Sequence, residues 1–134
     1  MERGGAVYEL THEFKFEATH QLPAQEGEVG TPHCHAWRGW LILKGSILMR
    51  HGPEVGTLVS AGRMAQLLAP VINDLDHCHL NEFVPEPTRE KVARYIFDRL
   101  YSVALGDPHL ADLMAGLTIE QVPGCRCTYW RGPL

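Results

Sequence analysis

Residues 7–20 read VYELTHEFKFEATH, and this stretch decides the fold. Apolar and histidine side chains take every second position, which places on one face Tyr8, Leu10, His12, Phe14, Phe16, Ala18 and His20. Charged residues and threonines fill the positions between them. A period of two predicts a long strand with one buried face, because successive side chains of a strand point to opposite sides. The fold is therefore expected to be built on a sheet.

Three more segments are expected to be extended. Residues 21–32 contain prolines and glycines and read as a loop, which leads into a second extended stretch over 33–49. Near the end of the chain, residues 117–122 and 125–130 read as two strands joined by Pro123-Gly124. Two short apolar runs around a Pro-Gly turn predict a hairpin.

Helical spacing of apolar residues replaces this pattern in the middle of the chain. One helix is expected over 64–75, kinked or shortened by Pro70, and another from Thr88 as N-cap to Gly106. The order β-β-α-α-β-β predicts an α+β fold: a four-stranded antiparallel sheet with two helices on one face. Such a sheet keeps exposed edges, which oligomerisation can cover.

The composition limits the function classes. The chain has 134 residues, 45% hydrophobic and 21% charged, which fits a single domain over residues 1–134. A net charge of −4 argues against a broad surface for nucleic acid or anionic lipid. The sequence contains no membrane-length apolar run and no signal-peptide pattern. We therefore expect no nucleic-acid partner, no membrane partner, a cytoplasmic location and four free cysteine thiols.

Three of the eight histidines have the spacing of metal ligands. His33 and His35 lie on one face of a predicted strand, about 7 Å apart along the backbone. His20 ends the preceding strand on its apolar face, and would reach the same point if the two strands pair. Three neutral imidazoles with an open fourth position are typical of a catalytic Zn²⁺ site. The alternative is a buried core histidine beside a chance H-x-H.

Three other segments carry candidate site residues, each with a plain structural alternative. Asp76 and His77 could form an acid/base imidazole with its orienting carboxylate, or a helix end where the imidazole meets the last carbonyls. Glu120 could accept two N–H bonds from the guanidine-like edge of a planar heterocycle, or could face solvent. Thr88 has a clear role as a helix cap.

Together these segments resemble the 6-pyruvoyltetrahydropterin synthase and 6-carboxytetrahydropterin synthase family. Residues 16–20 are similar to its F-x-A-x-H motif, residues 33–35 to its H-G-H, and residues 75–81 to its L-D-H-x-x-L-N. Residues 87–90 are similar to its P-T-x-E, and Glu120 falls near its C-terminal strand glutamate. The order and spacing agree over roughly residues 12–132.

The resemblance implies the tunnelling fold, in which subunits assemble through their sheets into a barrel, commonly a hexamer, with active sites at subunit interfaces. It implies a zinc enzyme whose usual substrate is 7,8-dihydroneopterin triphosphate. The metal polarises side-chain oxygens, and proton transfers eliminate triphosphate or cleave the side chain by a retro-aldol step. The residues matching the family's functional positions are His20, His33 and His35 for Zn²⁺, Asp76 and His77 for the proton relay, and Glu120 and Thr88 for the pterin.

Two departures from the family pattern affect the chemistry. The family's usual cysteine, four residues before the first histidine of H-x-H, is Val29 here. Glu28 is the candidate replacement, because a subgroup uses glutamate in that role and releases 6-hydroxymethyl-7,8-dihydropterin; a solvated loop glutamate is the alternative. The hairpin after Glu120 is about two residues longer than usual, so Gln121 or Val122 could stand at the pterin-anchoring position instead.

The resemblance, together with these residues, implies three candidate functions. A zinc-dependent lyase acting on 7,8-dihydroneopterin triphosphate or a related dihydropterin is favoured. A zinc lyase or cyclase recruited to a non-pterin small molecule in specialised metabolism would keep the metal and the relay but loosen the anchor at Glu120. A non-catalytic pterin-binding oligomer would keep the pocket without a base, but the three retained histidines and the Asp-His pair argue against it.

Overall fold

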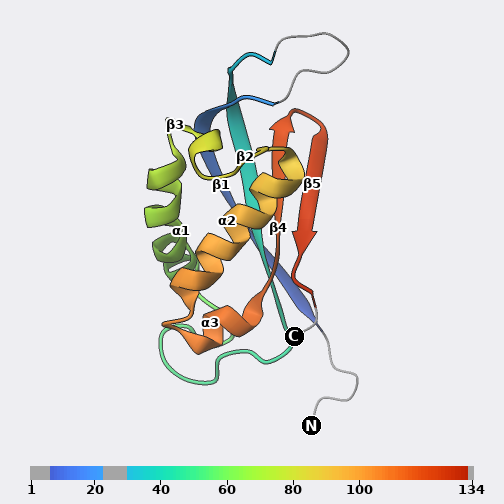
Figure 1. Ribbon diagram of the computed structural model, residues 1–134. Coiled ribbons are helices and arrows are strands. Elements are labelled where there is room, and N and C mark those ends of the chain that lie inside the picture. Colours follow the sequence, from blue (N-terminus) through green and yellow to red (C-terminus); the bar gives the residue numbers. More distant parts are fainter. Residues whose placement is uncertain (1–6, 23–29, 133–134) are drawn as a thin grey trace.

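The predicted first strand is β1, Tyr8–His20, in the computed structural model, which describes residues 7–22 and 30–132 (Figure 1). It pairs antiparallel along its whole length with β2, His33–Gly45. The predicted alternation is confirmed, because Phe14, Phe16 and Ala18 are buried on one face while the residues between them are largely exposed. The second strand ends at Gly45, four residues before the predicted extended stretch does.

Two helices cover one face of this sheet (Figure 1). The first, α1, Ala61–Leu75, is capped by Ser60, whose hydroxyl accepts the N–H of Arg63. It continues through Pro70 without being shortened. Because proline has no backbone N–H, the carbonyl of Gln66 has no helical donor, and Gln66 is exposed to water. The second, α2, Arg89–Ala104, is capped by Thr88 as predicted.

Three short elements lie outside those that the sequence pattern predicts. A two-residue strand, β3, Cys78–His79, pairs parallel with the end of β1 and leads into the 3-10 turn η1, Leu80–Glu82. A short helix, α3, Pro108–Leu113, precedes the last hairpin. The sheet therefore has five strands in the order β3-β1-β2-β4-β5. Its four long strands are antiparallel, and the α+β architecture is the predicted one.

The C-terminal hairpin confirms the predicted turn and adds an irregularity. Strands β4, Met114–Val122, and β5, Cys125–Trp130, pair around Pro123-Gly124, where Gly124 has a φ of +86° that favours glycine. The β4–β5 register shifts between Glu120 and Val122. The shift lies within the candidate site and affects how its side chains are presented.

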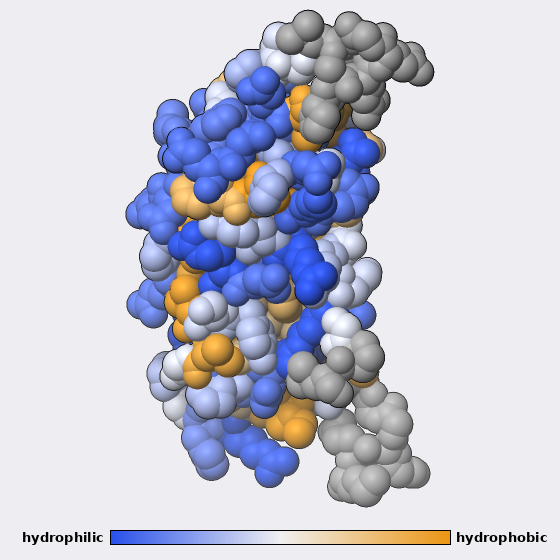
Figure 2. Space-filling view, in the orientation of Figure 1, coloured by the Kyte–Doolittle hydropathy of each residue, from blue (hydrophilic) through white to orange (hydrophobic). Residues whose placement is uncertain are grey.

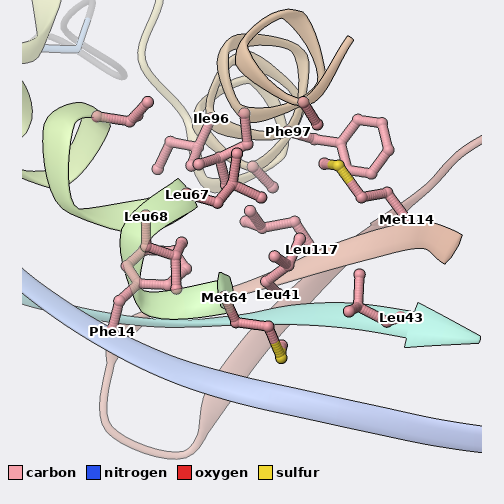
Figure 3. Packing of buried hydrophobic residues seen from close by; sticks show 14 of the residues in the cluster. Phe14, Leu41, Leu43, Met64, Leu67, Leu68, Ile96, Phe97, Met114 and Leu117 are labelled. Atoms are coloured by element: carbon pink, nitrogen blue, oxygen red, sulfur yellow. The ribbon is translucent and has the colours of Figure 1, made fainter. Parts of the chain in front are cut away.

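The core lies between the sheet and the helices (Figure 3). Side chains from both sheet and helices interdigitate there, among them Phe14, Leu41, Leu43, Met64, Leu67, Leu68, Ile96, Phe97, Met114 and Leu117. Gly39 lies opposite Phe14, and a Cβ at Gly39 would be 2.2 Å from the Phe14 ring. This close approach requires glycine at position 39 and fixes the ring over β2.

The helix-bearing side of the molecule, seen in Figure 2, is mostly hydrophilic with apolar residues scattered over it. Within the described residues, no helix combines the length and apolar character needed to cross a membrane.

Candidate functional site

The three predicted histidines come together at one end of the β1–β2 pair. His20 lies directly opposite His33 in the antiparallel register, and His35 lies opposite Ala18, so all three side chains share the core-side face. The His20 ring centroid is 5.0 Å from that of His35 and 6.5 Å from that of His33, and the His33–His35 distance is 6.1 Å. The pairing predicted from alternation therefore brings the three imidazoles into one cluster.

His20 is held more firmly than the other two. Its side chain is 2% exposed, its ring meets Trp37 edge-on at 5.3 Å, and its Nδ1 lies 3.0 Å from the carbonyl oxygen of Pro87. Because a carbonyl only accepts hydrogen bonds, Nδ1 carries the proton and Nε2 presents a lone pair. A metal-binding histidine is oriented in the same way by an acceptor at its second nitrogen.

The surroundings of His35 disfavour its protonated form. Burial lowers its pKa, and the nearby His20 and His33 lower it further. Metal ligands must be neutral imidazoles, so this environment favours the form of His35 that can bind a cation.

The ring distances in the histidine cluster are close to those of a zinc site, but the three rings do not converge on one point. Imidazole centroids in a tetrahedral site with Zn–N bonds of about 2.0–2.1 Å lie about 5 Å apart, which the His20–His35 pair meets. The distances from His33 to the other two rings are longer. Within the described residues, 7–22 and 30–132, no group of three or more His, Cys, Asp or Glu side chains is arranged to hold a metal ion. His33, the ligand candidate with the longer distances, is exposed at the strand end.

Asp76 and His77 form the predicted pair at the other edge of β1. The Asp76 carboxylate accepts the backbone N–H of Glu17 at 2.9 Å, and its second oxygen is 3.2 Å from Nδ1 of His77. The His77 backbone N–H donates to the Glu17 carbonyl at 2.5 Å. His77 has a φ of 64°, which is unfavourable for a non-glycine residue and is retained here by these contacts. Its side chain is 76% exposed and free to meet a ligand.

A cavity of about 520 Å³ joins this pair to Glu120. Its walls include Lys15, Glu17, Arg38, Asp76, His77, Glu120 and Gln121. Glu120 is 6% exposed and is paired with Arg38 across β2 and Arg126 across β5. Its carboxylate accepts from Arg126 at 3.2 Å, from Arg38 at 3.3 Å and from the Gly124 backbone N–H at 3.2 Å.

Glu120 is therefore a charged acceptor. The hydrogen bond from Arg126 is the main reason that its pKa lies below the usual value, and Arg38 adds to the effect. Both guanidinium groups also stack on Trp40, with their central carbons 4.9 Å (Arg38) and 4.1 Å (Arg126) from the ring centroid. The carboxylate already binds planar N–H donors, which is what a guanidine-like heterocycle edge would present.

One chain brings the candidate residues together in two groups. Asp76, His77 and Glu120 line the cavity, whereas the three histidines lie on the core-side face and are not among its lining residues. Thr88 lies in neither group, and its hydroxyl accepts the N–H of Lys91 as a helix cap. Glu28 lies outside the residues that the structure describes.

Sequence reasoning missed one side chain that touches the histidines. The Nε2 of Gln121 lies 3.2 Å from Nε2 of His20 and 3.2 Å from Nε2 of His35. From the sequence, Gln121 is predicted only as a substitute for Glu120 at the pterin anchor, whereas their contacts separate the two side chains: Glu120 meets Arg38 and Arg126, and Gln121 meets His20 and His35. Glu120 enters the cavity and Gln121 reaches the histidines, so a polar residue directly after the anchoring glutamate was the signal available in the sequence.

Comparisons with known proteins agree with one another. The family model described as 6-pyruvoyl tetrahydropterin synthase matches residues 9–132. A 6-carboxy-5,6,7,8-tetrahydropterin synthase from Synechocystis sp. is 33% identical over 109 residues, which cover 79% of this chain and 84% of that protein. A dihydroneopterin monophosphate aldolase from Pyrococcus furiosus is 25% identical over 104 residues, covering 78% of this chain and 84% of that protein.

Solved structures share the fold. The 6-pyruvoyl tetrahydropterin synthase of Caenorhabditis elegans superposes with a TM-score of 0.75 at 22% identity, covering 95% of this chain and 97% of that one. A Plasmodium vivax 6-pyruvoyltetrahydropterin synthase in which a catalytic glutamate is replaced by alanine has a TM-score of 0.70 at 17% identity, covering 96% and 99%. At these identities the likeness concerns the fold alone.

Proposed function

Because the chain belongs to the 6-pyruvoyl tetrahydropterin synthase family, we propose that it is a zinc-dependent lyase acting on 7,8-dihydroneopterin triphosphate or a closely related dihydropterin phosphate. Membership of the family indicates a pterin-processing lyase in general terms. The observation that carries the finer proposal is the cavity of about 520 Å³, whose lining includes both a buried carboxylate, Glu120, and the Asp76–His77 pair.

Glu120 is the proposed anchor for the pterin ring. A pterin presents an amino group and a ring N–H side by side, and a carboxylate can accept from both. Arg38 and Arg126 now make comparable contacts with Glu120, and Arg126 is exposed enough to turn away when a ligand enters. An ionised Glu120 would fix the pterin ring, so that the side chain of the pterin extends along the cavity.

His20, His33 and His35 are the proposed zinc ligands. When bound there, zinc would supply a Lewis acid that acidifies C–H bonds next to the substrate's side-chain oxygens. The tautomer of His20 that Pro87 selects, and the lowered pKa of His35 caused by burial, fit this donor set. The remaining chemistry belongs to the protein's own acids and bases.

His77 is the proposed proton carrier. If its Nδ1–H donates to Asp76, its Nε2 is free to accept a proton from substrate, and Asp76 stabilises the imidazolium that results. Glu28 is the proposed second base in place of the family's cysteine. The Plasmodium vivax enzyme noted above also uses a glutamate as a catalytic residue.

We further propose that the complete site forms between copies of the chain. Within one chain, none of the three histidines lines the cavity that holds Asp76 and His77. A barrel assembled through sheet edges, for which a hexamer is our proposal, would bring the relay of one copy to the histidines of another. A cytoplasmic location, a single domain and a pterin contact by Thr88 remain part of this proposal.

The two relatives suggest two kinds of reaction, that of a synthase and that of an aldolase. A 6-carboxy or 6-pyruvoyl pterin would place this chain with the synthases, and a 6-hydroxymethyl pterin would place it with the aldolase. The higher identity to the 6-carboxy-5,6,7,8-tetrahydropterin synthase favours the synthase reaction. The absence of a cysteine four residues before His33 favours the aldolase reaction.

The test is product analysis by mass spectrometry. Zinc-loaded protein is incubated separately with 7,8-dihydroneopterin triphosphate and with the monophosphate, and we expect one of these three pterins to form. His77→Ala should abolish turnover while leaving bound zinc unchanged, and His51→Ala, at an exposed turn, is the matched control. Unchanged substrate from protein that holds zinc at a 1:1 ratio would contradict the proposal.

A further inference from the structure

Gln121 occupies the centre of the histidine cluster. It is partly buried near the end of β4, and its amide nitrogen lies 3.2 Å from Nε2 of both His20 and His35. The residue also borders the cavity that contains Glu120. Gln121 therefore connects the cavity with the histidines, as does Trp37, which also lines the cavity and whose ring meets those of His20 and His35.

The direction of these hydrogen bonds follows from the His20 tautomer. Nδ1 of His20 donates to Pro87, so its Nε2 can only accept, and the Gln121 amide must be the donor. The amide has two hydrogens, and its distances allow one for each imidazole. The reversed amide would point an oxygen at a lone pair and lose the bond.

These are the lone pairs that a metal ion would use. A cation bound to both Nε2 atoms would need the space that the Gln121 amide now fills, because one nitrogen cannot be hydrogen-bonded and metal-bound through the same lone pair. His20 does not need Gln121 for its orientation, since Pro87 and Trp37 hold its ring independently. Gln121 therefore contributes more to blocking the site than to shaping it.

We propose that Gln121 is a displaceable occupant of the metal position: its side chain satisfies His20 and His35 in the metal-free protein and competes with the incoming ion. This inference rests on the proposed zinc site. It makes metal loading weaker and more readily reversible than three histidines alone would allow, because two hydrogen bonds must be broken first.

The test compares Gln121→Met with the wild type. Methionine keeps a similar length and volume but cannot donate, so the zinc dissociation constant, measured by competition with a chromophoric chelator, should fall by about ten- to thirtyfold. That factor corresponds to releasing two neutral hydrogen bonds. Gln66→Met, on the exposed face of α1, is the matched control and should leave the constant unchanged. Circular dichroism of each metal-free variant checks that it is folded.

A second variant tests whether the side chain lies at the metal position. Gln121→Glu places a carboxylate there, and should tighten zinc binding further than Gln121→Met and change the visible spectrum of the Co²⁺-loaded protein. Equal zinc affinity of Gln121→Met and wild type, with the Co²⁺ spectrum of Gln121→Glu unaltered, would overturn the inference while leaving the zinc site intact. Failure of the wild type to bind either ion would overturn the zinc proposal and this inference with it.

Discussion

His20 and His33 should differ sharply in their effect on the metal-free protein. We expect His20→Ala to lower the free energy of unfolding by about 2–4 kcal/mol and His33→Ala by less than about 1 kcal/mol. Both changes should abolish stoichiometric zinc binding. His20 thus has a structural role as well as a proposed metal-binding role. Unfolding measures the first and zinc binding measures the second.

The magnitude follows from the contacts of His20. Removing its ring leaves the carbonyl of Pro87, a buried residue just before α2, without its imidazole donor, which costs about 1–3 kcal/mol. The side chain is 2% exposed and packs on Trp37, so the vacated space adds about 1 kcal/mol of lost packing. His33 is exposed, which is why its loss should cost little.

The assay is urea unfolding followed by far-ultraviolet circular dichroism in the presence of a chelator. All variants are compared at one protein concentration, because association between copies shifts the apparent stability. Equal losses of stability in His20→Ala and His33→Ala would refute the structural role of His20. Zinc retained at a 1:1 ratio by either variant would refute its assignment as a ligand.

Three other perturbations test the fold around the site. Gly39→Ala should destabilise the fold by about 1–3 kcal/mol, because the new Cβ would overlap the Phe14 ring. In thermal unfolding, adding Phe14→Leu should recover part of that loss, whereas strictly additive effects of the two changes would contradict the overlap. Thr88→Ala should cost about 1 kcal/mol in urea unfolding through the lost helix cap, and Thr88→Ser should cost less; equal costs would argue against capping. Glu54→Gln should destabilise at pH 7, because hydrogen bonds from Ser60 and then Arg63 lower the pKa of Glu54 from 4.5 to about 2 in the folded protein. That contribution is present above pH 4.5 and lost as the pH falls toward 2, so stability curves of Glu54→Gln and wild type should converge over this range, whereas parallel curves would contradict it.

The histidine cluster was predictable because it depends on simple rules. Alternation along β1 puts His20 on the buried face, the H-x-H spacing puts His33 and His35 on one face, and the two strands pair antiparallel. Each step uses only neighbouring residues. The cap at Thr88 and the turn at Pro123-Gly124 follow local rules in the same way.

What the sequence did not reveal depends on register between distant strands. Arg38 and Arg126 reach Glu120 because they lie opposite it in β2 and β5, and no local pattern specifies that alignment. The strand β3 has two residues, too few for a period to be recognised. Its pairing with β1 comes from the contacts of Asp76 and His77 with Glu17, which join residues almost sixty positions apart.

Glu120 and Gln121 connect the two halves of the proposed site through one strand. Because successive side chains of β4 point to opposite faces, the carboxylate enters the cavity and the amide reaches the histidines. A slip of β4 by one residue would exchange them, placing a negative charge among the imidazoles and leaving the cavity without its acceptor. Leu117 and Ile119 prevent that slip, since both are fully buried on the helix-covered face and would be turned out of the core. The hydrophobic core therefore determines which chemistry each face of the sheet receives.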